Sequence, residues 1–386
     1  MLVPNKDRSY LSIYIHWPFC QAKCPYCDFN SHVRTSIDQK EWTQAYIKSL
    51  KLWKEIVPNF VVDTVFFGGG TPSMMKERTV YEIIQTIFFL WANTENIEIT
   101  LEANPTSSEK ATFSSYCQSG VNRLSLGIQA FNDLDLKRLG RMHSSKEAKE
   151  ALFVATNLFD RVSFDLMYGR QFQTLSDWKK ELKTATEFAT EHLSLYQLTV
   201  EQGTRFGELL DRNQLHGLPS DKLSSKFYTA TQEICYLSGL EAYEISNYAT
   251  RGNECRHNLT YWNSGCFLGV GPGAHGRLNI GSKRYRTETP TSPEVWIEHI
   301  KKYGIEKFLK EPLSNTERAE EYAIMALRLS LGLDINKFQE LGGVRLSTEK
   351  LRQLSEDNLV YVYENRLKTT AKGKLLTDQI LRELLC

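Results

Sequence analysis

Short runs rich in β-branched and aromatic residues alternate along this chain with longer segments whose apolar residues recur at helical spacing. The β-rich runs lie at residues 12–16, 63–67, 97–101, 123–128, 162–167 and 193–198, with a further candidate at 242–245. The helical segments between them include 39–56, 75–91, 146–158, 176–190 and 221–238. This alternation is typical of βαβ units that build a parallel sheet. About six such units favour an α/β fold of the partial (β/α) barrel kind over a doubly wound sheet.

The pattern changes after Pro312. Helices are expected at 316–331, 334–341 and 347–357, followed by a β-hairpin at 359–369 and a last helix at 372–385. This order resembles a winged-helix module, so we expect a small winged-helix-like α+β domain at the C-terminus. The chain is therefore expected to divide into a barrel at residues 1–250, a connecting segment at 251–311 and a C-terminal domain at 312–386.

The charge of the chain is balanced, with 47 Lys and Arg residues against 46 Asp and Glu residues. A net charge of +1 creates no strong field that would attract nucleic acid, a membrane surface or an acidic substrate. The helix expected at 347–357, which would contact DNA in a winged helix, is not basic. We therefore do not expect a nucleic-acid partner.

The N-terminal residues lack the apolar core of a signal peptide, and the most apolar stretch, at 86–92, is too short to span a bilayer. A cytoplasmic location without a membrane span is therefore expected. In that reducing compartment the eight cysteines are expected to be thiols or metal ligands rather than disulfides. Five of them are scattered and are typical of small buried residues, namely Cys117, Cys235, Cys255, Cys266 and Cys386.

The other three cysteines, Cys20, Cys24 and Cys27, follow the first expected strand within one loop. Three thiolates at Cys-x3-Cys-x2-Cys spacing can each bind one iron of a cubane cluster, which leaves the fourth iron free for an external chelator. Two alternatives stay open from the residues: a glutaredoxin-like dithiol of Cys24 and Cys27, and a Cys3His zinc site with His32 as fourth ligand. Covalent c-type haem is excluded because Asp28 stands where that motif needs histidine.

Polar and glycine-rich motifs follow the ends of the next expected strands, where barrel enzymes place their active sites. They are Gly-Gly-Gly-Thr-Pro at 68–72, Glu-Ala-Asn-Pro at 102–105, Gly-Ile-Gln-Ala-Phe at 127–131 and the strand residue Asp165. Each has a simpler explanation, such as a tight turn, a helix cap or a satisfied core carboxylate. Their recurrence on one rim of the sheet favours a common binding site.

Together these motifs resemble those of radical S-adenosylmethionine enzymes, in particular the oxygen-independent coproporphyrinogen III oxidase-like family. The resemblance extends over nearly the whole chain. The run His-Asn-Leu-Thr-Tyr-Trp at 257–262 and the run Leu-Gly-Val-Gly-Pro-Gly-Ala-His at 268–275 resemble the haem-chaperone branch of that family. The resemblance implies a [4Fe–4S] cluster, S-adenosylmethionine and haem as bound groups. It also implies a haem-acceptor protein and a reduced electron donor of the flavodoxin or ferredoxin type.

The resemblance also assigns roles to particular residues. It places Cys20, Cys24 and Cys27 on the cluster. It implies that nine residues surround S-adenosylmethionine: Tyr14, Tyr26, Gly69, Gly70, Thr71, Glu102, Gln129, Arg141 and Asp165. The glycines and Thr71 would meet the methionyl amine, and Tyr14 the cluster and the sulfonium. Tyr26 would lie near the adenine, and the last four residues would hold the ribose and the methionyl carboxylate. Carboxylates and a guanidinium on rigid strand ends suit a zwitterionic sulfonium ligand.

The sequence departs from the family pattern in two places. Coproporphyrinogen oxidases have a further cysteine two residues after the third, where this chain has Phe29. The family usually has Leu-Pro-Gly-Gln-Thr where this chain has Arg-Gln-Phe-Gln-Thr at 170–174. The first departure favours a haem chaperone that transfers haem to acceptor proteins over the alternative, a radical oxidoreductase acting on a porphyrinogen. A third hypothesis, a DNA-binding regulator with a cluster sensor, would need a basic recognition helix.

For haem itself, the sequence offers His257 as an axial ligand, with Cys255 and His275 as alternatives. Tyr261 and Trp262 would stack on the porphyrin. The simpler interpretation is that His257 pairs within a loop and the aromatic residues fill a seam between domains. The glycine-rich stretch at 265–276 is expected to form a loop.

Overall fold

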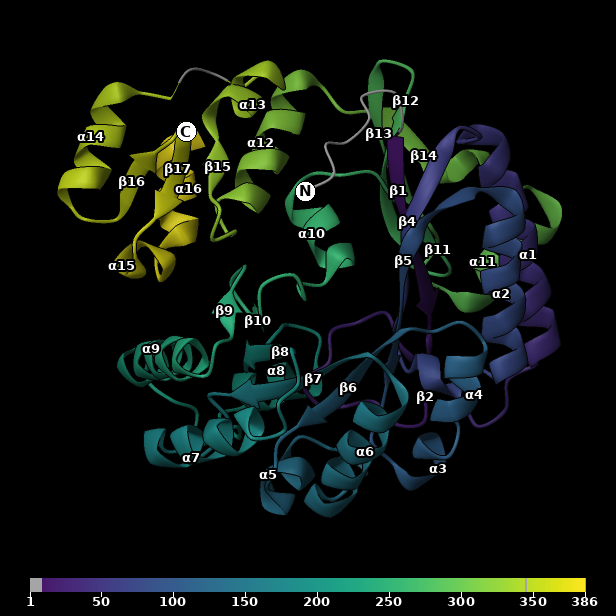
Figure 1. Ribbon diagram of the computed structural model, residues 1–386, viewed down its shortest axis with the longest axis horizontal. Coiled ribbons are helices and arrows are strands. Elements are labelled where there is room, and N and C mark those ends of the chain that lie inside the picture. Colours follow the sequence, from purple (N-terminus) through teal and green to yellow (C-terminus); the bar gives the residue numbers. More distant parts are fainter. Residues whose placement is uncertain (1–8, 344–345, 386) are drawn as a thin grey trace.

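The computed structural model describes residues 9–343 and 346–385 of the chain. A 12-stranded sheet forms its larger part, in the order β14-β13-β12-β11-β1-β4-β5-β6-β7-β8-β10-β9 (Figure 1). In that order the strands are Leu309–Pro312, Lys283–Glu288, His275–Ile280, Phe267–Val270, Ser9–Trp17, Phe60–Gly69, Ala92–Ala103, Arg123–Gln129, Arg161–Tyr168, His192–Gln197, Asn247–Ala249 and Glu241–Ala242.

The central strands of this sheet are parallel, from β11 through β1, β4, β5, β6 and β7 to β8. At one edge β12, β13 and β14 pair antiparallel, and at the other edge β10 and β9 do the same. The strands β1 and β4 to β8 are the six that the sequence pattern predicts. The expected α/β architecture is therefore confirmed, but of the candidate strand at 242–245 only Ala242 lies in a strand, as the second residue of β9.

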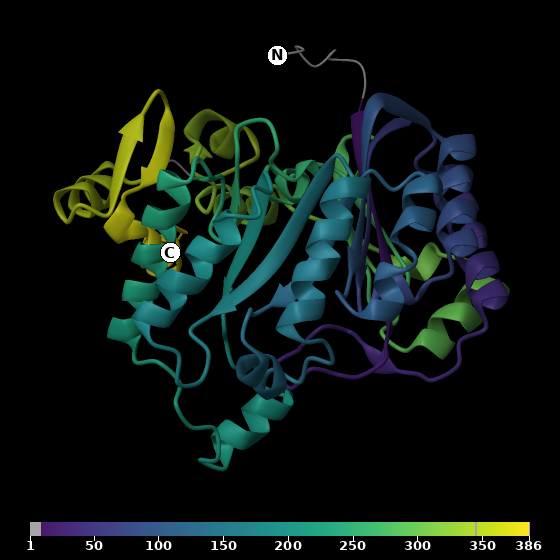
Figure 2. The same cartoon turned by 60° about the horizontal axis from the view of Figure 1, so that its bottom comes forward.

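Helices cover the outer side of the curved sheet (Figures 1 and 2). They are α1 Gln39–Ile56, α2 Glu77–Leu90, α3 Ser107–Lys110, α4 Phe113–Gln118, α5 Asp133–Arg138, α6 Ser145–Leu158, α7 Leu175–Thr186, α9 Asp221–Leu237 and α11 Pro293–Lys302. Helix α8 Arg205–Asp211 packs near the cysteine loop through Phe206, and α10 Arg256–Trp262 lies against the inner side of the sheet. Short elements complete this part: the strands β2 Phe19–Cys20 and β3 His32–Val33, and the 3-10 turns Pro72–Met74 and Glu306–Phe308. Most helices begin at a capping side chain, as Ser144 does for α6.

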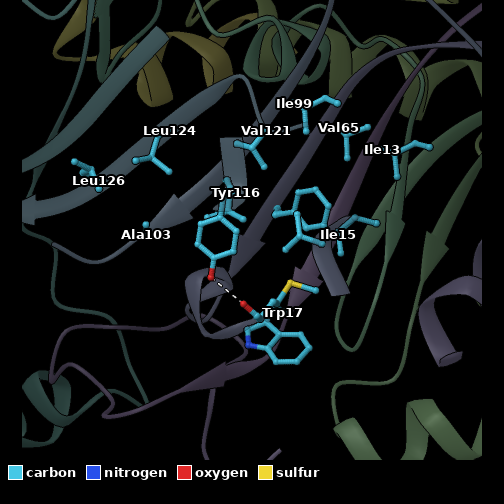
Figure 3. Packing of buried hydrophobic residues seen from close by; sticks show 14 of the residues in the cluster. Ile13, Ile15, Trp17, Val65, Ile99, Ala103, Tyr116, Val121, Leu124 and Leu126 are labelled. Atoms are coloured by element: carbon cyan, nitrogen blue, oxygen red, sulfur yellow. Dashed lines mark hydrogen bonds between the residues drawn. The ribbon is translucent and has the colours of Figure 1, made fainter. Parts of the chain in front are cut away.

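Apolar side chains fill the space between the sheet and these helices (Figure 3). Ile13, Ile15, Val65, Ile99 and Leu124 are all at most 1% exposed. Because side chains alternate along a strand, the residues between these positions face the inner side of the sheet. The core thus fixes which residues of β1, β5, β6 and β7 are presented on that inner side.

The C-terminal residues form a unit with a hydrophobic core of its own. Its elements are α12 Asn315–Ala326, β15 Leu333–Asp334, α13 Ile335–Glu340, α14 Thr348–Glu356, β16 Val360–Tyr363, β17 Arg366–Thr369, α15 Ala371–Lys374 and α16 Thr377–Leu385. The expected last helix is divided between α15 and α16. The expected first helix ends at Ala326, and the chain then turns into β15, which pairs with β17. The hairpin β16–β17 is present as predicted.

This C-terminal unit lies on the opposite side of the molecule from α1 and α2 (Figures 1 and 2). It is joined to the rest by polar contacts. Lys337 Nζ donates to the carbonyl of Asn263 at 2.9 Å, and the backbone N–H of Ser330 donates to the carbonyl of Tyr243 at 3.0 Å. Within the described ranges, the structure has no helix with the length and apolar character needed to cross a membrane.

Candidate cofactor site

A pocket with a cavity volume of about 360 Å³ opens at the carboxyl ends of the parallel strands. Its walls come from the loop after β1 and from the ends of β4, β5, β6, β7 and β8. The structure brings eleven of the predicted site residues to this pocket: Cys20, Cys24, Tyr26, Cys27, Gly69, Gly70, Thr71, Glu102, Gln129, Arg141 and Asp165. Residues that lie far apart in the sequence therefore share one cavity, as expected of strand ends in a parallel sheet.

The three cysteines lie on a loop whose ends are closed by a short parallel pairing of β2 with β3. Cys20 is 9% exposed, and the Thr71 hydroxyl donates to its sulfur at 3.4 Å. A backbone hydrogen bond of 3.1 Å from Cys27 to Cys24 turns the loop back on itself. Burial raises the pKa of the Cys20 and Cys27 thiols. The loop thus presents three sulfurs to one cavity.

The glycine-rich turn after β4 passes directly against this loop. The N–H of Gly70 donates to the Trp17 carbonyl at 2.7 Å, and the N–H of Thr71 donates to the Phe19 carbonyl at 2.8 Å. A Cβ on Gly70 would stand 2.6 Å from the Phe19 oxygen and 3.0 Å from the Cys20 sulfur. Only glycine allows so close an approach of backbone to backbone here.

Two carboxyl groups, Glu102 on β5 and Asp165 on β7, face the same cavity. Burial, with a smaller contribution from the nearby Asp165, raises the pKa of Glu102 to about 8, although the Gly69 N–H acts in the opposite direction. Burial also raises the pKa of Asp165 to about 6, against a hydrogen bond from Ser194. Two carboxyls whose ionisation is disfavoured suit a ligand that carries positive charge or hydroxyl donors.

The guanidinium of Arg141 reaches the pocket from the segment after α5. Its Nη2 donates to Asn104 Oδ1 at 2.6 Å and to the Gly127 carbonyl at 2.7 Å, and its Nη1 lies 3.6 Å from the Cys24 sulfur. Asn104 also donates to the Thr71 hydroxyl at 3.4 Å, so it joins the guanidinium to the glycine-rich turn. Sequence reasoning assigned no role to Asn104, although it follows Glu102 in the quoted motif.

The two tyrosines predicted for the site differ in position. Tyr26 lines the pocket with its ring centroid 6.5 Å from that of Phe206. Tyr14 does not line the pocket, and its hydroxyl pairs with His16 Nδ1 at 3.2 Å below the glycine-rich turn. A residue that sequence reasoning missed is Arg123 on β6, which is 2% exposed and electrostatically favours ionisation of both Glu102 and Asp165.

His257 lies on α10 and is 1% exposed. Its Nδ1 pairs with the Thr64 hydroxyl at 2.7 Å, and its Nε2 pairs with the Tyr261 hydroxyl at 2.6 Å. Burial lowers the pKa of His257 to about 3, so the imidazole is neutral. In this conformation neither ring nitrogen is free for an iron, and His257 could ligate haem only after α10 moved.

The glycine-rich stretch at 265–276 was expected to form a loop, and that expectation is wrong. Strand β11 and the start of β12 lie within it. A Cβ on Gly269 would stand 2.2 Å from the His275 oxygen, and one on Gly276 would stand 2.4 Å from the Thr287 hydroxyl. The glycines therefore allow close packing of neighbouring strands rather than a flexible loop.

The sequence matches the Radical SAM superfamily over residues 14–185 and the HemN C-terminal domain over residues 313–376. It is 32% identical to "Radical S-adenosyl methionine domain-containing protein 1, mitochondrial" of Bos taurus, over 99% of this chain and 88% of that protein. It is 33% identical to "Heme chaperone HemW" of Haemophilus influenzae, over 96% of this chain and 97% of that protein. The protein of the same name from Escherichia coli is 38% identical over 73% of this chain and 74% of its own.

Among solved structures, coproporphyrinogen III oxidase (HemN) from Escherichia coli superposes with a TM-score of 0.81 at 22% identity, covering 98% of this chain and 90% of that one. At that identity the likeness concerns the fold. The chain belongs to the radical S-adenosylmethionine superfamily, on the HemW-like branch that carries the HemN C-terminal domain. Membership of this superfamily implies S-adenosylmethionine and a [4Fe–4S] cluster as cofactors.

The pocket residues fit both cofactors. Its donor set consists of three cysteine sulfurs, which is the ligand chemistry of an iron–sulfur cluster. Among residues 9–343 and 346–385 no three or more His, Cys, Asp or Glu side chains are placed to hold one metal ion. A cubane spreads its ligands over separate irons, so its thiolates need not converge on one point. The buried Nε of Arg141 has no partner, which leaves a donor for an anionic ligand group.

Proposed function

We propose that this protein is a haem chaperone that binds a [4Fe–4S] cluster, S-adenosylmethionine and haem, and transfers haem to acceptor proteins. The observation that carries this proposal is 33% identity to a relative named as a haem chaperone, over nearly the full length of both chains. Phe29 at the position of the extra cysteine of coproporphyrinogen oxidases supports the same conclusion. Loading the protein with haem and measuring transfer to an apo-haem protein tests it.

In this proposal Cys20, Cys24 and Cys27 hold three irons, and the fourth iron takes S-adenosylmethionine. The bound cluster supplies one-electron chemistry, for which a flavodoxin or ferredoxin would be the electron donor. The protein's own part is to orient the cofactor. Backbone groups of Gly69 and Gly70 receive the methionyl amine, since the turn is held rigidly against the cysteine loop.

The remaining pocket residues divide the polar groups of the cofactor between them. Arg141 binds the methionyl carboxylate, because its guanidinium lines the pocket and its buried Nε has no partner. Glu102, Gln129 and Asp165 hold the ribose and the positively charged part of the ligand. Tyr26 packs near the adenine. Tyr14 does not line the pocket, so it acts indirectly: its ring packs against Gly68 of the glycine-rich turn.

Replacing Asp165 with alanine or Glu102 with glutamine is expected to weaken S-adenosylmethionine binding without unfolding the protein. Loss of a hydrogen bond to a charged group costs roughly 1.5–3 kcal/mol, or about ten- to a hundredfold in affinity. Calorimetry under anaerobic conditions measures the change. Glu95→Gln is the matched control, because Glu95 lies on β5 but is exposed and outside the pocket. Unchanged affinity in both pocket variants would place the cofactor elsewhere.

The same two carboxyls make binding pH-dependent. The pKa of Glu102 is about 8 and that of Asp165 is about 6, so both carboxyls become protonated as the pH falls from 8 to 6. S-adenosylmethionine is expected to bind the ionised carboxylates, so these protons must be released when it binds. Affinity for S-adenosylmethionine should therefore fall as the pH is lowered from 8 to 6. Glu102→Gln should flatten the upper part of this profile. An affinity of the native protein that is constant over this range would contradict the role of both carboxyls.

The haem ligand is expected among the three residues that the sequence offers. Cys255 is fully buried and its sulfur donates to Glu98 at 3.6 Å, whereas His275 at the start of β12 is exposed. We expect His275→Ala to lower haem affinity and shift the Soret band, and His257→Ala to leave both unchanged. Cluster content is measured in each variant as the control. A change in the His257 variant alone would instead favour opening of α10.

We also propose a cytoplasmic location, which differs from that of the Bos taurus relative, a protein named as mitochondrial.

A further inference from the structure

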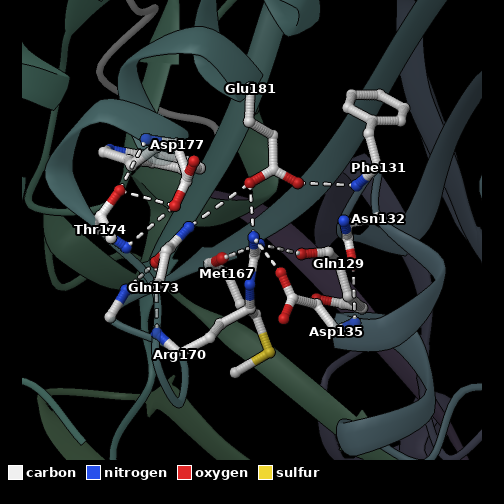
Figure 4. Close-up of polar contacts among 12 residues, drawn as sticks. Gln129, Phe131, Asn132, Asp135, Met167, Arg170, Gln173, Thr174, Asp177 and Glu181 are labelled. Carbon is white, nitrogen blue, oxygen red and sulfur yellow. Dashed lines mark hydrogen bonds and ion pairs between the residues drawn. The ribbon is translucent and has the colours of Figure 1, made fainter. Parts of the chain in front are cut away.

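A buried ion group, shown in Figure 4, lies next to Gln129 and Met167, two residues that line the cofactor pocket. The side chain of Arg170 is 4% exposed, and its Nη2 pairs with Glu181 Oε2 at 2.6 Å and with Asp135 Oδ2 at 3.0 Å. Its Nη1 donates to the Met167 carbonyl at 2.6 Å. A buried guanidinium is costly unless it is paired in this way. Arg170 belongs to the segment at 170–174 where the chain departs from the family pattern.

This ion group holds the backbone at the end of β6 from both sides. Arg170 Nη1 donates to the Gln129 carbonyl at 3.3 Å, and Glu181 Oε1 accepts from the Phe131 N–H at 2.7 Å. Gln129 has φ of 70°, in the left-handed region that non-glycine residues rarely adopt. Such a conformation persists only where the surroundings hold it. The register between β6 and β7 also shifts just before this residue.

The backbone of Gln129 decides where its side chain lies. Gln129 Nε2 stands 3.1 Å from the Cβ position of Gly127, and Arg141 Nη2 stands 3.2 Å from that same position. The two polar side chains are therefore neighbours in the pocket. Asp135, the second partner of Arg170, lies on α5, and the chain runs from α5 directly to Arg141. One ion group thus anchors the segment that carries both pocket residues.

We propose that Arg170 is a positioning residue for S-adenosylmethionine, which it does not touch, and that it acts by fixing the strained backbone of Gln129. Arg170 is absent from the pocket lining, which is why its effect must pass through other residues. Gln173 joins the group to the end of β7, because its Nε2 donates to Glu181 Oε2 at 3.4 Å and its Oε1 accepts from the Gly169 N–H at 2.7 Å. The inference rests on the proposed placement of S-adenosylmethionine in this pocket.

The test is a double-mutant cycle in the anaerobically reconstituted protein, with S-adenosylmethionine affinity measured by calorimetry. Arg170→Leu and Gln129→Ala should each weaken binding about tenfold. The double variant should also bind about tenfold more weakly than the native protein. If Arg170 acts only by fixing Gln129, its replacement has no further effect once the Gln129 side chain is gone. Independent effects would multiply to about a hundredfold and would overturn the inference. Unchanged affinity in Arg170→Leu would overturn it as well.

Three further variants separate positioning from general stability. Arg277→Leu removes a guanidinium that pairs with Glu321 at 2.7 Å far from the pocket, and it should leave affinity unchanged. Arg170→Lys keeps the charge and should give an intermediate affinity. If Arg170→Leu does not fold, Asp135→Asn replaces it in the cycle with the same expected coupling. Failure of the native protein to bind S-adenosylmethionine would instead overturn the proposed function, and the inference with it.

Discussion

Replacing any one of Cys20, Cys24 or Cys27 with alanine is expected to abolish the brown chromophore of the anaerobically reconstituted protein. The native protein should carry about four irons per chain, one for each corner of the cubane. In the proposed site each cysteine would hold one iron from a loop that is closed by β2 and β3, and the described pocket lining holds no fourth cysteine that would replace a lost ligand. Loss of one thiolate therefore exposes a second iron and releases the cluster.

Iron content and the visible absorption spectrum measure this effect. Cys235→Ala is the matched control, because Cys235 is fully buried on α9 and lies outside the pocket. The control protein should keep its iron. A colourless native protein with stoichiometric zinc would contradict the cluster and favour the Cys3His alternative with His32.

The second large effect is expected at Glu98, on the inner side of β5. Its side chain is fully buried and accepts from Arg161 Nη1 at 2.5 Å, from the His257 N–H at 3.1 Å and from the Arg256 N–H at 3.3 Å. It therefore binds the start of α10 to the sheet. Glu98→Gln should lower the free energy of unfolding by about 3 kcal/mol, because it removes a fully buried carboxylate that faces the buried guanidinium of Arg123 and pairs with Arg161.

Urea unfolding at equilibrium measures this loss. Glu321→Gln is the control, since Glu321 and its partner Arg277 are 31% and 21% exposed and their pair should be worth about 1 kcal/mol or less. Burial raises the pKa of Glu98, but Arg123 and Arg161 outweigh it and hold that pKa below its usual value. The stabilisation by Glu98 should therefore be lost as the pH falls towards acid. Equal losses in the two variants would contradict the role of Glu98.

The parallel strands were predictable because each is an apolar run that packs under helices. Ile13 and Ile15 on β1, and Ile99 and Leu101 on β5, alternate with residues that face inward. The strands at the far edge were not predictable in the same way. Gly269 and Gly276 are permissive residues, and only the contacts of β11, β12 and β13 decide that they lie in strands. Tertiary context overrides propensity there.

The residues of the candidate site also fall into two groups, those marked by sequence motifs and those defined only by tertiary contacts. Its cysteines, glycines and carboxyls carry sequence motifs, and all of them reach one pocket. Asn104 lies within the motif at 102–105, but its role depends on contacts with Arg141 and Thr71, which are distant in sequence, and no local pattern marks Arg123. Arg170 is visible in the sequence as a departure, but its partners Asp135 and Glu181 lie on α5 and α7. His257 lies in a recognisable motif on α10, yet its burial depends on contacts with Thr64 on β4 and Glu98 on β5.

Whether this protein carries haem or oxidises a porphyrinogen is decided by one anaerobic comparison. Reconstituted protein with S-adenosylmethionine and a reductant receives either haem or coproporphyrinogen III. We expect stoichiometric haem binding, seen as a Soret band, and transfer of that haem to an apo-haem protein, with no protoporphyrinogen formed. Catalytic formation of protoporphyrinogen, together with no haem binding, would contradict the chaperone function and favour the oxidoreductase.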